Sequence, residues 1–189
     1  MSRHVLILRG SPRVKGNSAV LADQVAAGAK NGGAQVDDVY LHSMDIRPCD
    51  ACDLCIEQGE GCVIEDDMQA LYPKLLQADA IVLASPIYWF TISAQLKLCI
   101  DRWYGLQTKG WKKMAGKQVA IILTYGDTDL YTSGGINAIH TFESMFRFLH
   151  MNIAGIIHGT AGDTGDVEKQ PDLMKKAYTL GTSIAKDAV

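Results

Sequence analysis

Short apolar runs alternate along this chain with segments whose apolar residues recur at the spacing of a helix. A strand buried on both faces is almost continuously apolar, so the short runs predict strands. Strands that alternate with helices build βαβ units, which predicts an α/β fold: a doubly wound, three-layer sandwich around a five-stranded parallel sheet, with five helices. Two sheet orders are common for such folds, and this pattern does not choose between them. The predicted strands are Val5–Arg9, Gln35–Leu41, Ala80–Ala84, Val119–Leu123 and Ile153–Ile157.

No repeat and no Pro/Gly/Ser linker divides the chain, which predicts a single domain over residues 1–189. The helix before the third strand has two local signals. Asp66 and Gln69 have the spacing of a capping box at its start. Pro73 lies inside it and predicts a kink or an early end.

The composition excludes several classes of protein. Apolar residues make up 48% of the chain, which is typical of a globular domain and not of a disordered one. The net charge of −3 gives no positive excess that would attract nucleic acid or an anionic membrane, so neither partner is expected. The chain also lacks a long apolar run and a signal peptide pattern, so we expect a cytoplasmic protein. In that reducing compartment, five cysteines indicate metal or redox chemistry and not disulfides.

The loop after the first predicted strand has the composition of a phosphate site. It reads GSPRVKGNS from Gly10 to Ser18 and leads from a buried strand into a helix. Its hydroxyl and backbone N–H groups could bind a phosphate at the positive end of that helix, and Arg13 could add a charged donor. The loop is neither a Walker A motif nor a GxGxxG motif. A simple helix cap with turn glycines would explain the same residues.

Two further loops follow the third and fourth predicted strands. They are candidates for a binding site, because ligands in such sheets bind beyond the carboxyl ends of the strands. SPIYWF, residues 85–90, places three aromatic side chains where they could stack on a flat ring or meet a second subunit. TYG, residues 124–126, could present backbone groups to a polar ring edge. If each segment is considered alone, residues 85–90 could be an aromatic core cluster and residues 124–126 an ordinary surface loop. Together, the three loops predict a site for a phosphorylated planar ring, and flavin mononucleotide (FMN) has that shape.

Two segments resemble those of a known protein family, and the similarity spans about residues 4–160. They are GSPRVKGNS and DDMQALYPKLLQADAIVLASPIYWFTISAQLKLCIDR. The chain resembles the NADPH-dependent FMN reductase family of flavodoxin-like proteins, in a branch similar to the iron–sulfur flavoproteins. The resemblance implies a flavodoxin-like fold with strand order 2-1-3-4-5, and a homodimer or homotetramer. The FMN-binding residues that it implies are Ser11, Arg13, Asn17 and Ser18 at the phosphate, Pro86, Ile87, Tyr88, Trp89 and Phe90 along the ring and ribityl chain, and Tyr125 and Gly126 along the other edge.

The segment 49–62 holds four cysteines, spaced Cys49-x2-Cys52-x2-Cys55-x6-Cys62. Four thiolates can ligate a 4Fe-4S cluster, and the compact spacing resembles that of the iron–sulfur flavoproteins, although its last interval is longer than in bacterial ferredoxins. A zinc site with four cysteines and a loop of thiols without metal both stay open. The fifth cysteine, Cys99, lies in a predicted helix and is expected to be a buried apolar side chain.

The predicted function is an FMN-dependent oxidoreductase that passes electrons from NAD(P)H through the flavin to a quinone, a free flavin, a metal ion or an iron–sulfur acceptor. The cofactor supplies the chemistry, so no catalytic side chain is predicted, and the five histidines lie outside the three loops. The alternative is a non-enzymatic flavodoxin-like or iron–sulfur flavoprotein electron carrier, for which the lysine-rich loop 109–117 offers no acidic docking face. A zinc-organised binding module would leave the first two loops unexplained. The sequence does not distinguish NADH from NADPH.

Overall fold

The computed structural model describes residues 2–59, 61–108 and 110–186, so residue 60 of the cysteine segment and residue 109 of the lysine-rich loop lie outside it. One sheet has the order β2-β1-β3-β5-β6, all parallel, with β4 paired antiparallel to β3. Counted over the parallel strands alone, this is the predicted order 2-1-3-4-5, which is confirmed. The strands are β1 (His4–Arg9), β2 (Gln35–Tyr40), β3 (Ala80–Tyr88), β4 (Thr91–Ile92), β5 (Gln118–Tyr125) and β6 (Asn152–Thr160).

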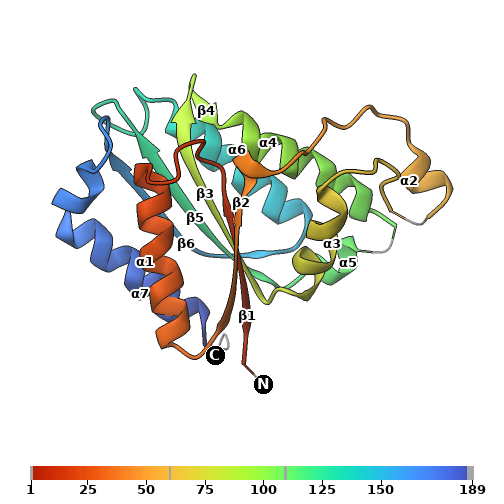
Figure 1. Ribbon diagram of the computed structural model, residues 1–189, viewed down its shortest axis with the longest axis horizontal. Coiled ribbons are helices and arrows are strands. Elements are labelled where there is room, and N and C mark those ends of the chain that lie inside the picture. The colour runs from red at the N-terminus through yellow and green to blue at the C-terminus, as the bar shows by residue number, and fades with distance from the viewer. Residues whose placement is uncertain (1, 60, 109, 187–189) are drawn as a thin grey trace.

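Helices cover both faces of the sheet, as Figure 1 shows, which confirms the three-layer sandwich. One face carries α1 (Asn17–Asn31) and α7 (Pro171–Ile184), and the other carries α3 (Met68–Gln77), α4 (Ala94–Asp101) and α6 (Gly135–Phe148). These five correspond to the five predicted helices. Shorter turns are α2 (Leu54–Glu57), α5 (Trp111–Met114), η1 (Leu41–Ser43), η2 (Arg102–Leu106) and η3 (Asp166–Lys169). Over the described ranges, no helix combines the length and apolar character needed to cross a membrane.

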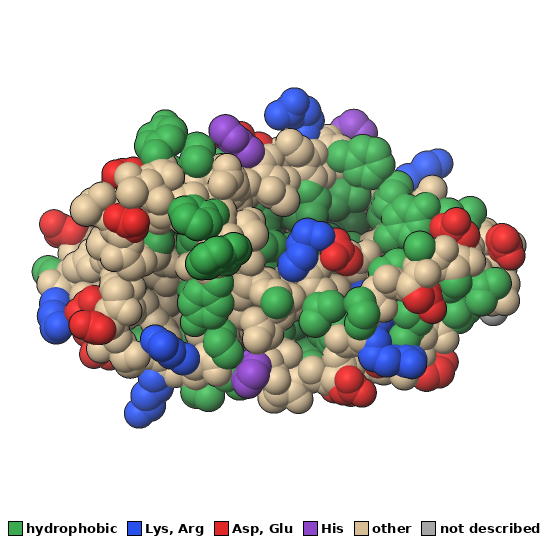
Figure 2. Space-filling view, turned by 90° about the horizontal axis from the view of Figure 1, so that it is seen from above, with side chains coloured by type: hydrophobic (Ala, Val, Ile, Leu, Met, Phe, Trp, Pro, Cys, Tyr) green, Lys and Arg blue, Asp and Glu red, His purple; other side chains and the backbone are tan. Residues whose placement is uncertain are grey.

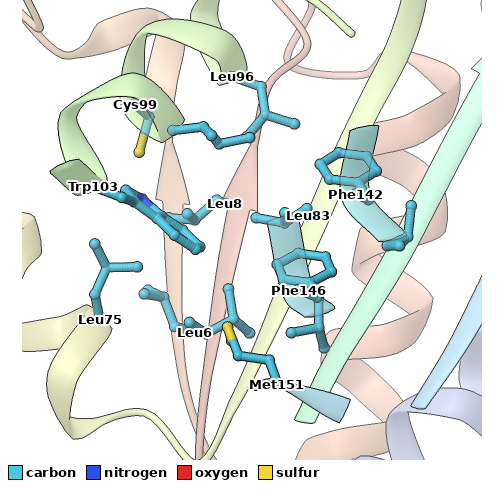
Figure 3. Packing of buried hydrophobic residues seen from close by; sticks show 14 of the residues in the cluster. Leu6, Leu8, Leu75, Leu83, Leu96, Cys99, Trp103, Phe142, Phe146 and Met151 are labelled. Atoms are coloured by element: carbon cyan, nitrogen blue, oxygen red, sulfur yellow. The ribbon is translucent and has the colours of Figure 1, made fainter. Parts of the chain in front are cut away.

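The sheet separates two hydrophobic cores because successive side chains of a strand point to opposite faces. In β1, Leu6 and Leu8 pack under α3, α4 and α6, while Val5 and Ile7 pack under α1 and α7. Figure 3 shows the first core, where Trp103 lies beside the two leucines. The two cores hold the carboxyl ends of the strands in fixed positions along one edge, and the three predicted loops start from that edge.

The third strand is longer than predicted. It does not end at Ala84 but continues through Pro86 to Tyr88, and the chain then turns back into β4. Proline lacks an N–H and is disfavoured inside a sheet, which is why the sequence suggested an earlier end. The pairing of β1 with β3 stops at Ala84, so beyond that residue one side of β3 has no β1 partner and a proline is tolerated.

The predicted capping box is wrong. Gln69 does not reach back to the start of α3; its amide donates to the backbone oxygens of Cys62 at 2.7 Å and Ile64 at 2.8 Å. Asp66 accepts from the N–H of Met68 at 3.0 Å, but its carboxylate is mainly engaged elsewhere. Helix α3 also continues past Pro73, so the helix does not end there as the proline suggested.

Candidate active site

The three predicted loops meet at the carboxyl edge of the sheet around one cavity. Trp89 and Phe90 line an adjoining cavity, and the two cavities share Ile87, Tyr125 and Gly126. The sequence missed the loop after β6, where Ala161 and Gly162 also line the cavity; its only signal was a glycine-containing strand end. The predicted residues that line the first cavity are Ser11, Arg13, Asn17, Ser18, Pro86, Ile87, Tyr88, Tyr125 and Gly126.

The first loop folds into a tight turn around the Ser11 hydroxyl. This hydroxyl accepts the N–H of Arg13 at 3.0 Å and donates to the Arg13 backbone oxygen at 3.1 Å, which also accepts the N–H of Gly16. A Cβ atom at position 16 would lie 2.6 Å from the Ser11 Oγ, closer than such atoms come in real structures. Gly16 is therefore required for the turn to close, and it leaves a small cradle at the entry to α1.

Asn17, the first residue of α1, has no free side-chain amide to offer a ligand. Its Nδ2 donates to the backbone oxygens of Ala161 at 3.1 Å and Asp163 at 2.8 Å. Its Oδ1 accepts the N–H groups of Gly165 at 3.2 Å and Val167 at 3.4 Å. The side chain thus ties the loop after β6 to α1, and only the backbone N–H of Asn17 stays available at the positive end of the helix.

Ser18 is the opposite case, because its hydroxyl is buried and unused. The residue is 1% exposed, and its Oγ has no hydrogen-bond partner among the described residues. A buried hydroxyl without a partner is destabilising, and native structures usually explain one by a water molecule, an ion or a ligand. Arg13 is the only charged side chain among the described residues that line this cavity, which suits an anionic group.

The aromatic segment forms the turn of the β3–β4 hairpin. Trp89 and Phe90 both have left-handed backbone conformations, with φ of 48° and 68°, which bulky residues rarely adopt. The turn is fixed by Gly134, where a Cβ would lie 2.5 Å from that of Phe90, and by Asn137, which donates to the Phe90 backbone oxygen at 3.2 Å. Trp89 is 92% exposed. Figure 2 shows hydrophobic side chains gathered on this side of the molecule. An exposed hydrophobic patch and a strained backbone, here at Trp89 and Phe90, both often mark a binding site.

Tyr125 ends β5 and pairs with a histidine that the sequence did not single out. Its hydroxyl lies 2.9 Å from the Nδ1 of His158 on β6, and the two rings are stacked with centroids 6.0 Å apart. Burial, and then the charge of Asp129, raise the pKa of Tyr125, so its hydroxyl stays protonated at neutral pH. The two strands are adjacent in the sheet but far apart in the sequence, which hid the contact.

The four cysteines of the segment 49–62 line a third cavity, together with Arg102. Cys49 and Cys52 are exposed, Cys55 is buried, and all four thiols are free. Burial, and then the neighbouring cysteines, raise the pKa of Cys55, as expected where several thiols lie close together. The loop is strained, since Ala51 and Asp53 both have positive φ.

In the described part of the chain, no group of three His, Cys, Asp or Glu side chains is arranged as a site for one metal ion. Four thiolates could ligate either a 4Fe-4S cluster or a zinc ion. The four cysteines therefore stay candidate ligands, and the zinc alternative stays open. Cys99 is fully buried in α4, as predicted.

A family model described as NADPH-dependent FMN reductase matches residues 3–162. The chain belongs to this family. A Bacillus subtilis protein, YwqN, whose assigned name is that of an NAD(P)H-dependent FMN-containing oxidoreductase, is 30% identical to it over 181 residues, covering 93% of this chain and 95% of that protein. An iron–sulfur flavoprotein of Archaeoglobus fulgidus is 32% identical over 181 residues, covering 94% of this chain and 76% of that protein.

Among solved structures, an NAD(P)H:quinone oxidoreductase from Methanothermobacter marburgensis is similar with a TM-score of 0.79. The match covers 100% of this chain and 99% of that one at 19% identity, so it concerns the fold alone. It agrees with the flavodoxin-like sheet order.

The cavity at the entry to α1 fits the cofactor of the family. FMN ends in a phosphate, and the cavity offers the unpartnered Ser18 hydroxyl, the cradle at Gly16, the positive end of α1 and Arg13. The hairpin aromatics and Tyr125 lie on the side where the ring system would extend. By its family, the chain is an FMN-dependent oxidoreductase.

Proposed function

We propose that this protein accepts a hydride from NAD(P)H on an FMN held between the three loops and passes the electrons to a second acceptor. The observation that carries the proposal is the buried Ser18 hydroxyl, which has no partner among the described residues at the cavity beside the start of α1. The bound flavin supplies the redox chemistry. The remaining roles belong to the side chains and backbone of the chain itself.

The phosphate would be held by the Ser18 hydroxyl, the Arg13 guanidinium, and backbone N–H groups of the turn from Ser11 to Asn17. In this arrangement Asn17 contributes through its backbone and not through its amide, which is fully hydrogen-bonded within the chain. Binding energy collected at the phosphate, remote from the reacting atom, fixes the position of the ring.

The ring and ribityl chain would lie along residues 86–90 on one side and Tyr125 and Gly126 on the other. Backbone donors near Tyr88 and Gly126 would face the polar edge of the ring and stabilise negative charge on it. Trp89 and Phe90, on a strained hairpin, would cover part of the ring while leaving space for the nicotinamide to stack.

The cysteine segment is proposed to hold a 4Fe-4S cluster through Cys49, Cys52, Cys55 and Cys62. All four line one cavity, and iron–sulfur flavoproteins occur among the relatives. Such a cluster would carry electrons singly, so it would let the protein deliver the two electrons of a hydride one at a time. Free thiols without metal are the alternative, which iron and sulfide assays distinguish.

The test is anaerobic purification followed by absorption spectra before and after dithionite, with iron and sulfide assays. Steady-state oxidation of NADH and of NADPH is then measured with a quinone and with free flavin as acceptors. Bound FMN with turnover supports the proposal. Bound FMN without turnover, and with a long-lived semiquinone, would support the electron-carrier alternative instead.

We further propose a cytoplasmic homodimer or homotetramer. The location rests on the five cysteines, none of which forms a disulfide in the described structure. The assembly rests on the exposed aromatic hairpin, which a second copy would cover. Light scattering with and without FMN tests the assembly, and a monomer under both conditions would refute it.

A further inference from the structure

A buried ion pair lies beside the cysteine cavity and plays no part in the flavin site. Arg102 and Asp66 form it, and neither side chain has any exposed area. Arginine is rarely buried to this degree without a specific partner. Arg102 begins η2, directly after α4, and lines the same cavity as the four cysteines.

Most of the hydrogen bonds of this pair anchor the cysteine segment to the domain. The guanidinium donates to the backbone oxygens of Arg47 at 2.9 Å and Ile64 at 3.4 Å. It also donates to both carboxylate oxygens of Asp66. Asp66 in turn accepts the N–H groups of Arg47 at 2.9 Å and Met68 at 3.0 Å. These contacts fix the residues on both sides of the segment, which accounts for a structural role.

One contact goes beyond that role, because the Nη2 of Arg102 lies 3.3 Å from the Sγ of Cys62. A neutral amide could also donate hydrogen bonds to the segment, but the guanidinium brings a positive charge to the sulfur as well. That charge is permanent, because a guanidinium is not deprotonated in proteins, and Asp66 is its buried counter-ion.

We propose that Arg102 is a positioning residue that raises the reduction potential of an iron–sulfur cluster ligated by Cys62. The inference rests on the proposed function, in which the four cysteines hold a 4Fe-4S cluster. Reduction of the cluster adds one electron, supplied by the reduced flavin, with no proton taken up and no bond broken. The potential of such a cluster depends on the net charge around it and on hydrogen bonds to its sulfurs. A fixed cationic donor on Cys62 stabilises the added negative charge.

The sign of the shift separates this role from a purely structural one. Arg102→Gln removes the positive charge and lowers the potential, whereas Asp66→Asn leaves that charge without its counter-ion and raises the potential. At a fixed ambient potential, we expect the ratio of reduced to oxidised cluster to fall at least tenfold in R102Q, which is about 59 mV for a one-electron couple. A structural anchor alone would move both variants in the same direction, or neither.

The experiment is a redox titration of the purified holoprotein, followed by EPR of the reduced cluster. The matched control is Lys74→Gln combined with Asp37→Asn, which removes a partly exposed ion pair of 2.7 Å that does not line the cysteine cavity and is expected to leave the potential unchanged. Unchanged potentials in R102Q and D66N, with the cluster intact, would overturn the proposal.

A further variant covers the case in which the single variants do not fold. In R102Q combined with D66N, two neutral amides can hydrogen-bond in place of the ions, and the charge at Cys62 is still lost. A potential below that of the wild type supports the proposal, and an unchanged one overturns it. Wild-type protein that holds FMN but neither iron nor sulfide would refute the cluster itself, and the role of Arg102 with it.

Discussion

Replacing Ser18 by alanine should stabilise the protein without FMN and weaken its binding of FMN. The hydroxyl is buried, and no described residue accepts or donates a hydrogen bond to it. A buried polar group without a partner costs about 1–3 kcal/mol, so its removal should raise the free energy of unfolding of the FMN-free protein by about 1 kcal/mol. For a chain of this length, that corresponds to about 2–4 °C in Tm.

The effect on FMN has the opposite sign. A hydrogen bond from a hydroxyl to a charged group is worth about 1.5–3 kcal/mol, so S18A should raise the Kd for FMN about tenfold to a hundredfold. Fluorescence quenching of FMN measures the Kd, and urea unfolding of the FMN-free protein measures stability.

Ser93→Ala is the matched control for stability. Ser93 is also fully buried, but its hydroxyl donates to the backbone oxygen of Gly10 at 2.6 Å, so its loss should destabilise the protein by about 1–2 kcal/mol. If S18A behaves like S93A and the Kd for FMN is unchanged, the Ser18 hydroxyl serves the fold and our assignment of the phosphate site is refuted.

Three further predictions concern the hairpin, the thiols and the buried ion pair. Trp89→Gly should relieve the left-handed backbone, raise the free energy of unfolding by about 1 kcal/mol and weaken FMN binding; lower stability in urea would contradict the strain argument. Burial raises the pKa of the Cys99 thiol to about 12, so alkylation of the folded, metal-free protein at pH 8, followed by mass spectrometry, should label Cys49 and Cys52 long before Cys99. Although burial alone raises the pKa of Asp66, its hydrogen bonds hold it below its ordinary value of 3.8, so the wild type should lose this contribution to stability as the pH falls below that value. D66N should lack this part of the pH dependence and be about 3–5 kcal/mol less stable at pH 7, as measured by urea unfolding across pH.

The sequence was sufficient for the fold where local pattern and tertiary structure agree. The continuous apolar runs of β1, β3 and β5 are buried on both faces; glycine and polar residues follow β1 and β5 at the carboxyl edge, and aromatic residues follow β3. Because ligand sites in such sheets lie at that edge, the three loops could be combined into one site from the amino-acid sequence alone.

The hairpin could not be predicted because its turn breaks the usual sequence rules. Tight hairpins favour Asn-Gly or Asp-Gly, and here Trp89 and Phe90 occupy the left-handed positions. The contacts of Phe90 with Gly134 and Asn137, more than forty residues later, explain how this turn is held.

The sequence also does not show contacts whose partners are distant along the chain. Asn17 stays a predicted residue of the phosphate site, but its side-chain amide is used by the loop after β6. Asp66 reads as a helix cap, but its main partner is Arg102. Likewise, the pair of Tyr125 with His158 joins two strands that are neighbours only in the sheet. Composition and spacing identify which side chains are available, but not which partner each will find.

The most direct test of the central claim compares the binding of FMN with that of riboflavin, which lacks the phosphate. Fluorescence quenching gives both dissociation constants under the same conditions. If the start of α1 holds the phosphate, FMN should bind at least about a hundredfold more tightly, a difference of about 2.7 kcal/mol. Equal affinities for the two flavins would show that the phosphate is not held there, and would contradict the site as a whole.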